Sequence, residues 1–294
     1  MSDCKKVLTG ISGWHRLEGF YPPRTRPSDM LGYYAEHFSV VEIATTFQGI
    51  PGEERVKEWA DSVPSGFVFD VLAFGGLTLH QTRPGVPTNN ASHTWLELAV
   101  EPPDVIFDEF ASAIGPLIAV DKLGIVLLQF PPWFGFGREG FDYLARCRNL
   151  LSGIPLGVEL RNPSWFFPGQ RLEETLDHLI DLEIALSVAD FPEEREVPPF
   201  LPSVTMTDVV PVRLHGRLEG SWHKIGATAT TIAQFTYGEE ELSKLISPVT
   251  ALAAEADQVH AIFNVQPSAG AIRAATEFQL MMDTQLSKDA QSNL

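Results

Sequence analysis

Three carboxylates and one histidine stand where short apolar runs of this 294-residue sequence end, and these residue types can exchange protons with a substrate. They are Glu42, Glu159, Asp190 and His215. Carboxylates that share an apolar enclosure acquire different pKa values, so one can act as a general acid and another as a general base. Histidine titrates near neutrality without help from its surroundings. We therefore predict that these four residues are catalytic.

A structural alternative stays open for two of them. Arg161 follows Glu159 closely, and Arg213 precedes His215. Glu159 could simply form a buried ion pair with one of these arginines, and a histidine before a glycine at a strand end can merely cap a loop. The catalytic interpretation predicts that Glu159→Gln abolishes turnover and leaves the fold intact.

Further polar and aromatic residues follow the same apolar runs and are predicted to bind the substrate. Guanidinium and amide groups orient a polar ligand, and aromatic rings offer flat faces to a sugar or a base. The Ser268-Ala269-Gly270 segment opens a predicted helix, whose free N–H groups could bind an anion with countercharge from Arg213 and Arg217. The predicted substrate-binding residues are Ser12, Trp14, Gln129, Arg161, Trp165, Arg213, Asn264 and Gly270.

No motif assigns a cofactor. Carboxylates beside a histidine could hold a divalent metal, but no segment has the His-Glu-x-x-His spacing of a zinc site, so the sequence leaves the metal open. The P-loop and the G-x-S-x-G esterase motif are both absent from the sequence. Enzymes that depend on those motifs therefore lose their usual support.

Eight apolar runs position these residues, and most are separated by segments of helical character. Several are apolar at successive positions, as in Ile125-Val126-Leu127-Leu128, which is typical of parallel strands covered on both faces. The predicted strands are Val7–Ser12, Val40–Thr46, Phe67–Ala73, Gly124–Phe130, Leu156–Arg161, Ala185–Asp190, Val210–His215 and His260–Val265. The predicted helices are Pro27–His37, Gly52–Ser62, Ile106–Ala119, Gly140–Leu151, Arg171–Leu182, Glu239–Ala256 and Ala269–Leu286.

Eight strand–helix units predict an α/β protein that is a single (β/α)8 barrel of the TIM type. We expect the barrel to occupy residues 5–286 and residues 287–294 to form a flexible tail. Such barrels place their sites at the carboxyl ends of the strands. Three long segments leave those ends and are expected to cover the site: Phe74–Val105, Phe191–Thr207 and Gly216–Tyr237.

The composition limits the classes of molecule that the protein is expected to bind. A formal charge of -17 argues against broad binding to nucleic acid or anionic membranes. The sequence lacks a signal-peptide pattern at its start and an apolar run long enough to span a bilayer, and its two cysteines form no disulfide framework. We expect a soluble cytoplasmic protein that binds a small-molecule ligand, and the sequence does not set its oligomeric state.

Motifs at the predicted strand ends resemble those of the YecE-like family, the domain of unknown function 72. The resemblance runs from about Gly10 to about Ala275 and implies a soluble (β/α)8 fold, without implying a particular reaction. It rests on Ile11-Ser12-Gly13-Trp14, Phe20-Tyr21-Pro22, Tyr33-Tyr34-Ala35-Glu36-His37-Phe38, Val41-Glu42-Ile43, Thr46-Phe47, Gln129-Phe130-Pro131-Pro132, Glu159-Leu160-Arg161-Asn162-Pro163-Ser164-Trp165-Phe166, Ala189-Asp190, Val212-Arg213-Leu214-His215-Gly216, Phe263-Asn264 and Ala269-Gly270-Ala271.

This chain departs from the resemblance at four positions. The family usually has a threonine at Ile11, asparagines at Ala44 and Val265, and often a lysine at Leu72. Each change removes a hydrogen-bonding group from the predicted site. Our hypothesis is that this chain has altered chemistry or specificity, or that it only binds a ligand.

Three functions follow from these observations. The first is a small-molecule enzyme, a hydrolase, lyase or isomerase, acting on a polar substrate that is sugar-like or phosphorylated. The second is a noncatalytic barrel that binds a ligand or a protein partner. The third is a metal-dependent phosphodiesterase acting on nucleic acid, which the negative net charge disfavours.

Overall fold

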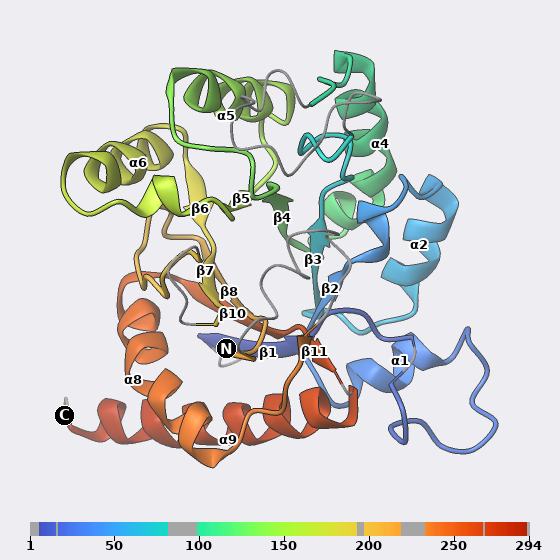
Figure 1. Ribbon diagram of the computed structural model, residues 1–294. Coiled ribbons are helices and arrows are strands. Elements are labelled where there is room, and N and C mark those ends of the chain that lie inside the picture. Colours follow the sequence, from blue (N-terminus) through green and yellow to red (C-terminus); the bar gives the residue numbers. More distant parts are fainter. Residues whose placement is uncertain are drawn as a thin grey trace.

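The computed structural model describes residues 6–15, 17–81, 99–192, 197–218, 233–266 and 268–292. Parallel strands lie at its centre and helices surround them (Figure 1). The strands are β1 (Val7–Ile11), β2 (Val40–Ile43), β3 (Val68–Leu72), β4 (Leu123–Gln129), β5 (Leu156–Glu159), β6 (Ile184–Leu186), β7 (Val188–Asp190), β8 (Val209–Leu214), β9 (Ala233–Gln234), β10 (Gln258–Phe263) and β11 (Val265–Gln266).

The strands form an α/β fold with parallel sheets. A five-stranded sheet has the order β2-β3-β4-β5-β6, and a four-stranded sheet has the order β1-β10-β8-β7. A small sheet pairs β11 with β9. All pairings within the two large sheets are parallel, so the carboxyl ends of their strands lie on one side.

Two features of the chain join the edges of the large sheets. β6 and β7 are separated only by Ser187, so the chain leaves one sheet and enters the other without a turn. At the opposite edges, Ser12 after β1 forms a parallel bridge to Glu42 on β2. The sequence predicted a single strand at Ala185–Asp190, and this strand is the one that passes between the sheets.

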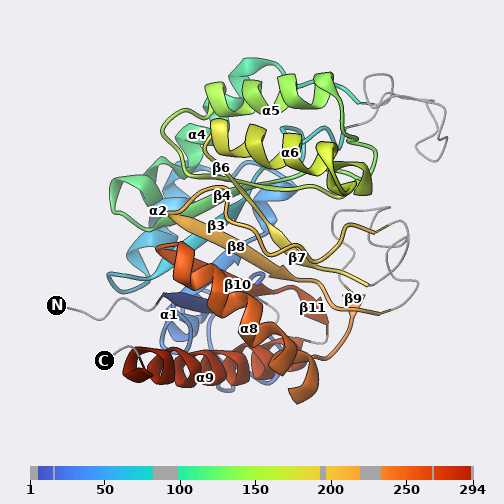
Figure 2. The same ribbon diagram turned by 90° about the vertical axis from the view of Figure 1, so that its left-hand side faces the viewer.

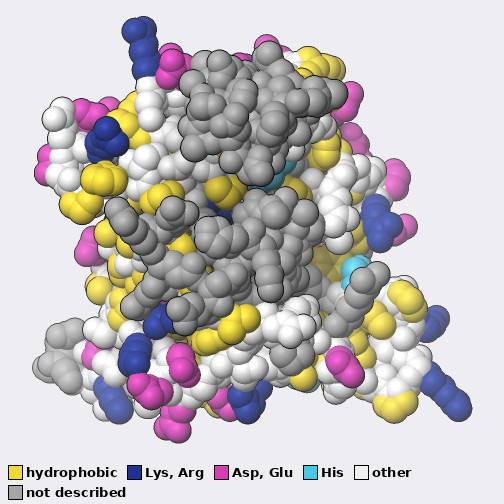
Figure 3. Space-filling model, viewed as in Figure 1, with side chains coloured by type: hydrophobic (Ala, Val, Ile, Leu, Met, Phe, Trp, Pro, Cys, Tyr) yellow, Lys and Arg dark blue, Asp and Glu magenta, His cyan; other side chains and the backbone are white. Residues whose placement is uncertain are grey.

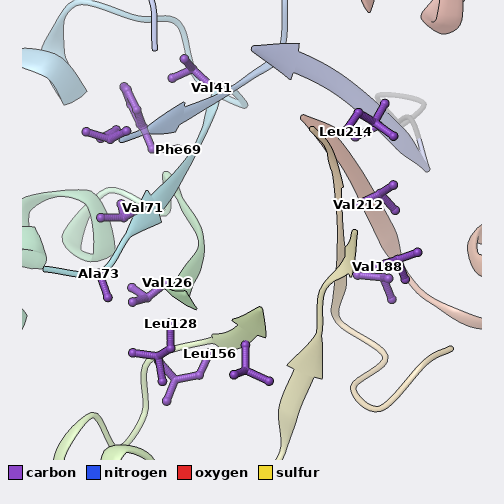
Figure 4. Close-up of a cluster of buried hydrophobic side chains, with 14 of the residues drawn as sticks. Val41, Phe69, Val71, Ala73, Val126, Leu128, Leu156, Val188, Val212 and Leu214 are labelled. Carbon is purple, nitrogen blue, oxygen red and sulfur yellow. The ribbon is translucent and has the colours of Figure 1, made fainter. Parts of the chain in front are cut away.

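Side chains alternate between a shared interior and the surrounding helices, as the period of a β-strand requires. Inside, Leu8 and Ile262 of the four-stranded sheet pack against Val40 of the five-stranded sheet. Outside, Figure 4 shows Val71 and Val212 on opposite outer sides of the two sheets, pointing away from each other. Both faces of the strands are therefore apolar over most of their length, which explains the unbroken apolar runs in the sequence.

The helices cover the outer faces. They are α1 (Met30–Ala35), α2 (Glu53–Asp61), α4 (Asp104–Ala119), α5 (Arg138–Leu150), α6 (Gln170–Asp181), α8 (Glu239–Glu255) and α9 (Ser268–Ser292), with short 3-10 helices η1 (Thr45–Phe47) and η2 (Pro163–Phe166). Figure 2 shows α5 and α6 on one side of the strands and α8 and α9 on the other.

Local signals explain where helices begin. The first turn of α8 holds three glutamates, which favour the positive end of the helix dipole, and Glu241 accepts from the N–H of Gly238 at 2.8 Å. The N-cap of α6 is Gly169, which has a φ of 89° that other residues rarely adopt.

Some sequence-predicted boundaries are wrong. The second predicted strand, Val40–Thr46, ends at Ile43, and η1 takes its last residues. The last helix continues to Ser292, so the expected flexible tail is helical from Ser287 to Ser292. Hydrogen bonds four residues apart support this extension: Ser287 Oγ donates to the carbonyl of Asp283 (2.7 Å), and Gln285 Nε2 donates to Asp289 Oδ1 (2.9 Å). Each of the three predicted covering segments lies partly outside the described residues, at residues 82–98, 193–196 and 219–232.

Within the described ranges, no helix combines the length and the apolarity that crossing a membrane requires. On the face seen in Figure 3, acidic and basic side chains of the described residues are interspersed around the rim.

Candidate active site at the carboxyl ends of the strands

Charged side chains from both large sheets meet at the carboxyl ends of the strands. Arg213, on β8, donates from Nη2 to Glu42 Oε1 (2.9 Å) and from Nη1 to Glu159 Oε2 (2.5 Å). Glu42 lies on β2 and Glu159 ends β5, so one guanidinium links two strands of the opposite sheet. Ser12 Oγ donates to Glu42 Oε1 (2.7 Å). Each of the three charged residues is at most 1% exposed.

Gln129 and Arg161 complete this buried network. Arg161 donates from Nε to Glu159 Oε1 (2.6 Å) and from Nη2 to Gln129 Oε1 (3.0 Å). Arg213 Nη1 also donates to Gln129 Oε1 (2.9 Å). One side-chain carbonyl therefore accepts from two guanidinium groups. We call Glu42, Gln129, Glu159, Arg161, Arg213 and His215 the carboxyl-end cluster.

The arginines keep Glu159 ionised. Burial by itself raises the pKa of the Glu159 carboxyl, but the positive charges of Arg213 and Arg161 outweigh burial and hold that pKa well below its ordinary value. Burial likewise lowers the pKa of the Arg213 guanidinium, and the carboxylates of Glu159 and Glu42 reverse this, so the pKa is raised overall. Glu159 is thus a fixed negative charge between two fixed positive charges.

This arrangement changes what is expected of Glu159→Gln. Glu159→Gln was expected to leave the fold intact. Glutamine would remove the carboxylate that pairs with both Arg161 and Arg213 in a site closed to water. Removing one partner of a buried ion pair leaves an uncompensated charge and strongly destabilises a protein. Loss of activity in this variant would therefore not by itself show that Glu159 is catalytic.

Glu159 also fixes the tautomer of His215. His215 Nε2 lies 2.9 Å from Glu159 Oε2, and an ionised carboxylate can only accept, so the ring carries its proton on Nε2. Nδ1 is then an acceptor, and it faces Asn264 Nδ2 at 3.3 Å. Burial lowers the pKa of His215 below its ordinary value, although Glu159 acts in the other direction, so the ring is neutral at neutral pH. A neutral imidazole held by a carboxylate is the arrangement of a general base.

A cavity of about 620 Å³ is lined by Asn264, the residue that His215 Nδ1 faces. Ser12, Trp14 and Asn264 line it, and Asn264 separates it from His215 Nδ1. Its volume suits a small molecule. Three of the four positions at which this chain departs from the resembled family, Ile11, Ala44 and Val265, also line the cavity.

Asp190 does not join the cluster. His215 stacks on Phe191, with ring centroids 4.8 Å apart, so the residue before Phe191 points to the opposite face of the strand. The carboxylate of Asp190 accepts instead from Tyr237 OH and Arg217 Nε, both at 2.7 Å. The structure therefore separates Asp190 from the other three residues predicted to be catalytic.

Two predicted binding residues also lie elsewhere. Trp165 is fully buried in η2, where its Nε1 donates to the carbonyl of Phe134 (2.7 Å) and its ring stacks on the Phe134 ring. Gly270 lies so close to Thr236 that a Cβ would come within 3.1 Å of Thr236 Oγ1, so chain packing accounts for this glycine.

The anion site predicted at the start of α9 is not assembled as expected. Ser268 Oγ accepts from the N–H of Glu18 (3.0 Å), Arg213 lies in the carboxyl-end cluster, and Arg217 pairs with Asp190. The nine predicted residues that the structure brings together, in the cluster or at the cavity wall, are Ser12, Trp14, Glu42, Gln129, Glu159, Arg161, Arg213, His215 and Asn264. Their roles toward a ligand stay predictions.

His80 and Phe191 belong to this region and were missed from the sequence. His80 follows a turn after β3, and its Nδ1 lies 3.0 Å from Thr78 Oγ1. Burial, together with the positive charge of Arg161, lowers the pKa of His80 to about 3. The guanidinium of Arg161 lies over the ring of Phe191 at 5.8 Å. Neither residue ends an apolar run, so strand patterning gave no signal for either.

No group of three His, Cys, Asp or Glu side chains with metal-binding geometry occurs among the residues that the structure describes. The divalent metal that the sequence left open, and with it the phosphodiesterase alternative, therefore has no assigned ligands here.

Comparison with known proteins gives one consistent family. The family model described as "Protein of unknown function DUF72" matches residues 8–293. The UPF0759 protein YunF of Bacillus subtilis (strain 168) is 30% identical over 263 residues, which cover 88% of each chain. A crystal structure of a DUF72 family protein from Thermotoga maritima MSB8 has a TM-score of 0.77 and 27% identity, covering 95% of this chain and 100% of that one. One from Enterococcus faecalis V583 has a TM-score of 0.78 and 26% identity, covering 94% and 95%.

Proposed function

The chain belongs to the DUF72 family of proteins of unknown function, and because the family assigns no reaction, we propose from the site itself that the protein is an enzyme that moves a proton on a small polar molecule. The reaction classes that need this step are hydrolases, lyases and isomerases. The observation that carries the proposal is the Glu159–His215 pair, whose second ring nitrogen faces Asn264 at the wall of the cavity.

In the proposed mechanism, His215 Nδ1 is the general base. Among the described residues, its lone pair is engaged only by the 3.3 Å contact with the Asn264 amide, which is longer than a good hydrogen bond. A substrate that displaces this amide could give its proton to Nδ1. The imidazolium that forms would be stabilised by Glu159, which holds the ring through Nε2.

The remaining residues of the site have positioning roles in this proposal. Arg161 and Arg213 hold the Glu159 carboxylate on both of its oxygens, which fixes the histidine in turn. Ser12 and Asn264 line the cavity and contact the substrate directly.

The proposal includes closure of the two large sheets into one (β/α)8 barrel. The Ser12–Glu42 bridge and the passage of the chain through Ser187 support closure at the two pairs of sheet edges. Ion pairs across the interior, such as Arg213 with Glu42, support it as well. A closed barrel places the cluster and the cavity where barrel enzymes have their sites.

One observation favours a noncatalytic alternative. The two glutamates and two arginines of the cluster balance in charge, and each glutamate is already paired within it. A network that satisfies itself can serve only to hold the strands together. In that case, the cavity would bind a ligand without converting it.

Proton NMR in D2O distinguishes the two functions. The protein would be incubated with a panel of sugars, sugar phosphates and hydroxy acids, and the spectra would report both product formation and exchange of carbon-bound hydrogen for deuterium. Melting temperatures with each compound report binding independently. We expect conversion or exchange of at least one compound that also raises the melting temperature, and its loss in His215→Asn. Melting shifts without conversion in the unaltered protein, or conversion that persists in His215→Asn, would refute the catalytic proposal.

A further inference from the structure

Two buried N–H donors, one in the carboxyl-end cluster and one outside it, have no acceptor among the residues that the structure describes. They are Gln129 Nε2 and Trp133 Nε1, and neither atom has a hydrogen-bond partner in the described part of the chain. The oxygen of the Gln129 amide holds both guanidinium groups of the cluster, which fixes the orientation of the amide and leaves its nitrogen as the unsatisfied end. Gln129 is 1% exposed, so water does not replace the missing acceptor at the surface.

The two donors belong to one string of side chains. Gln129 contacts Arg161, the charge of Arg161 acts on His80, and the His80 ring lies 6.1 Å from the ring of Trp133. Trp133 follows β4 by four residues, whereas His80 follows β3, so the string spans the ends of two neighbouring strands. Trp133 and His80 are only partly buried, so the string begins at the molecular surface and ends inside the cluster.

The charges around the string favour a negative ligand. Arg161 is the charged group that acts on His80. The carboxylate that neutralises Arg161 is Glu159, which accepts from Nε of the guanidinium whose Nη2 donates to Gln129, and which also pairs with Arg213 and His215. The described residues of the string supply donors and positive charge, and no carboxylate acts on His80 among its described surroundings.

Leaving a donor buried without an acceptor costs free energy, and two such donors along one string of side chains need an explanation. We propose that Gln129 Nε2, Trp133 Nε1 and Arg161 form a subsite for an oxyanion, a carboxylate or phosphate group carried by the ligand. An oxyanion supplies several acceptor lone pairs at once and is attracted by a guanidinium. The inference rests on the proposed function only in calling this ligand the substrate, because the subsite would bind an anion whether or not conversion follows.

Indole NMR of the full chain tests the subsite directly. The protein has six tryptophans, and each indole N–H of ¹⁵N-labelled protein gives one signal. Trp133→Phe identifies the Trp133 signal by its disappearance. Sodium phosphate and sodium acetate would be titrated separately, which distinguishes the two oxyanions, with sodium chloride at matched ionic strength and glucose as the neutral control.

We expect the Trp133 signal to move saturably with phosphate or acetate, because its N–H gains an acceptor. The Trp165 signal should stay in place, because that N–H already donates to the carbonyl of Phe134. No movement with either oxyanion, or the same movement with chloride or glucose, would overturn the inference.

Two variants separate the subsite from general packing. Gln129→Glu keeps an acceptor for both arginines but replaces the donor by a carboxylate oxygen, so we expect the dissociation constant to rise by about tenfold or more without a fall in melting temperature. Trp165→Phe is the matched control: it removes a satisfied internal N–H, so it should lower the melting temperature and leave the dissociation constant unchanged. Equal affinity in Gln129→Glu and the unaltered protein would contradict the subsite.

The outcome is independent of turnover. Saturable oxyanion binding at Trp133 without conversion of any compound supports the subsite and refutes the proposed function. Conversion of a compound without any response of Trp133 to oxyanions does the reverse.

Discussion

His215 and His260 each lie 2.9 Å from the buried carboxylate of a residue on a β-strand, but their surroundings differ. His215 shares Glu159 with two arginines, and its other ring nitrogen faces Asn264 at the cavity wall. His260 Nδ1 lies within hydrogen-bond distance of both carboxylate oxygens of Asp70, and its Nε2 lies 3.3 Å from Gln258 Oε1.

The two pairs also lie at different depths. His260 is in the first half of β10, fully buried, and Asp70 is in the middle of β3, whereas Glu159 and His215 stand at and just beyond the carboxyl ends of their strands. The comparison teaches that a buried histidine–carboxylate pair does not by itself indicate catalysis. What distinguishes the outer pair is a ring nitrogen that faces Asn264, a residue that lines a cavity. We therefore interpret the Asp70–His260 pair as structural and the Glu159–His215 pair as functional.

The largest effect on stability is expected at Glu159. Glu159→Gln leaves Arg161 and Arg213 without their shared counterion in a site closed to water, so the free energy of unfolding should fall by about 3–5 kcal/mol. Urea unfolding followed by circular dichroism measures this. A loss below about 1 kcal/mol would mean that water reaches the cluster more easily than its burial indicates.

Removing the matching carboxylate of the inner pair should cost less. Asp70→Asn keeps the shape of the side chain and leaves no guanidinium group without a counterion. We therefore expect a loss of about 1–3 kcal/mol in the free energy of unfolding. The same urea experiment compares it with Glu159→Gln. If Asp70→Asn costs as much as Glu159→Gln, the arginines do not distinguish the two pairs.

Acid should destabilise the folded protein in two stages, through the histidines His215 and His80 and then through Glu159. Burial lowers the pKa of His215 below 6.5 and that of His80 to about 3. Below about pH 6.5, both histidines therefore bind a proton more readily in the unfolded chain than in the folded protein. The free energy of unfolding should then fall with decreasing pH, by at most about 1.4 kcal/mol per pH unit for each histidine. Below about 4.5, protonation of Glu159 in the unfolded chain adds to the loss, because its folded pKa is held well below that value.

Urea unfolding over a series of pH values from about 7 to about 4 checks these two stages. His80→Gln should reduce the slope between these limits, since glutamine does not titrate. An unfolding free energy that stays constant over this range, or a slope that His80→Gln leaves unchanged, would count against these histidine environments.

The smallest effect is expected at Tyr237, outside the cluster. Its hydroxyl donates to Asp190 Oδ2 and accepts from the N–H of Gly216 (2.9 Å), so Tyr237→Phe should cost about 0.5–1.5 kcal/mol in unfolding free energy. Because Asp190 faces away from His215, conversion of any substrate found should be unaffected. A fall in conversion beyond tenfold at equal folded fraction would return Asp190 to the catalytic group.

The sequence predicted that several residues of the carboxyl-end cluster lie close together, because these polar residues stand where apolar runs end. Parallel strands bring their carboxyl ends to one side, so Glu42, Glu159 and His215 meet although they are far apart in the chain. The register of a strand was harder to predict. A shift of one residue turns a side chain to the other face, which explains why Asp190 was grouped with the cluster and Phe191 was not.

Other features left no sequence signal. The Asp70–His260 pair joins residues 190 positions apart on strands of different sheets, and periodicity carries no information about such partners. Trp165 follows a strand end as Trp133 does, but only the structure shows that the Trp165 N–H is satisfied by Phe134 and that the Trp133 N–H is not.

The central claim is that the outer pair acts on a substrate and the inner pair does not. The most direct test is the rate of conversion or deuterium exchange, measured by proton NMR for His215→Asn and Asp70→Asn at equal concentrations of folded protein. We predict that His215→Asn lowers the rate by about 10²–10⁴-fold, the range for removal of a general base, and that Asp70→Asn leaves it within about twofold. Equal losses in the two variants, or full activity in His215→Asn, would contradict this account.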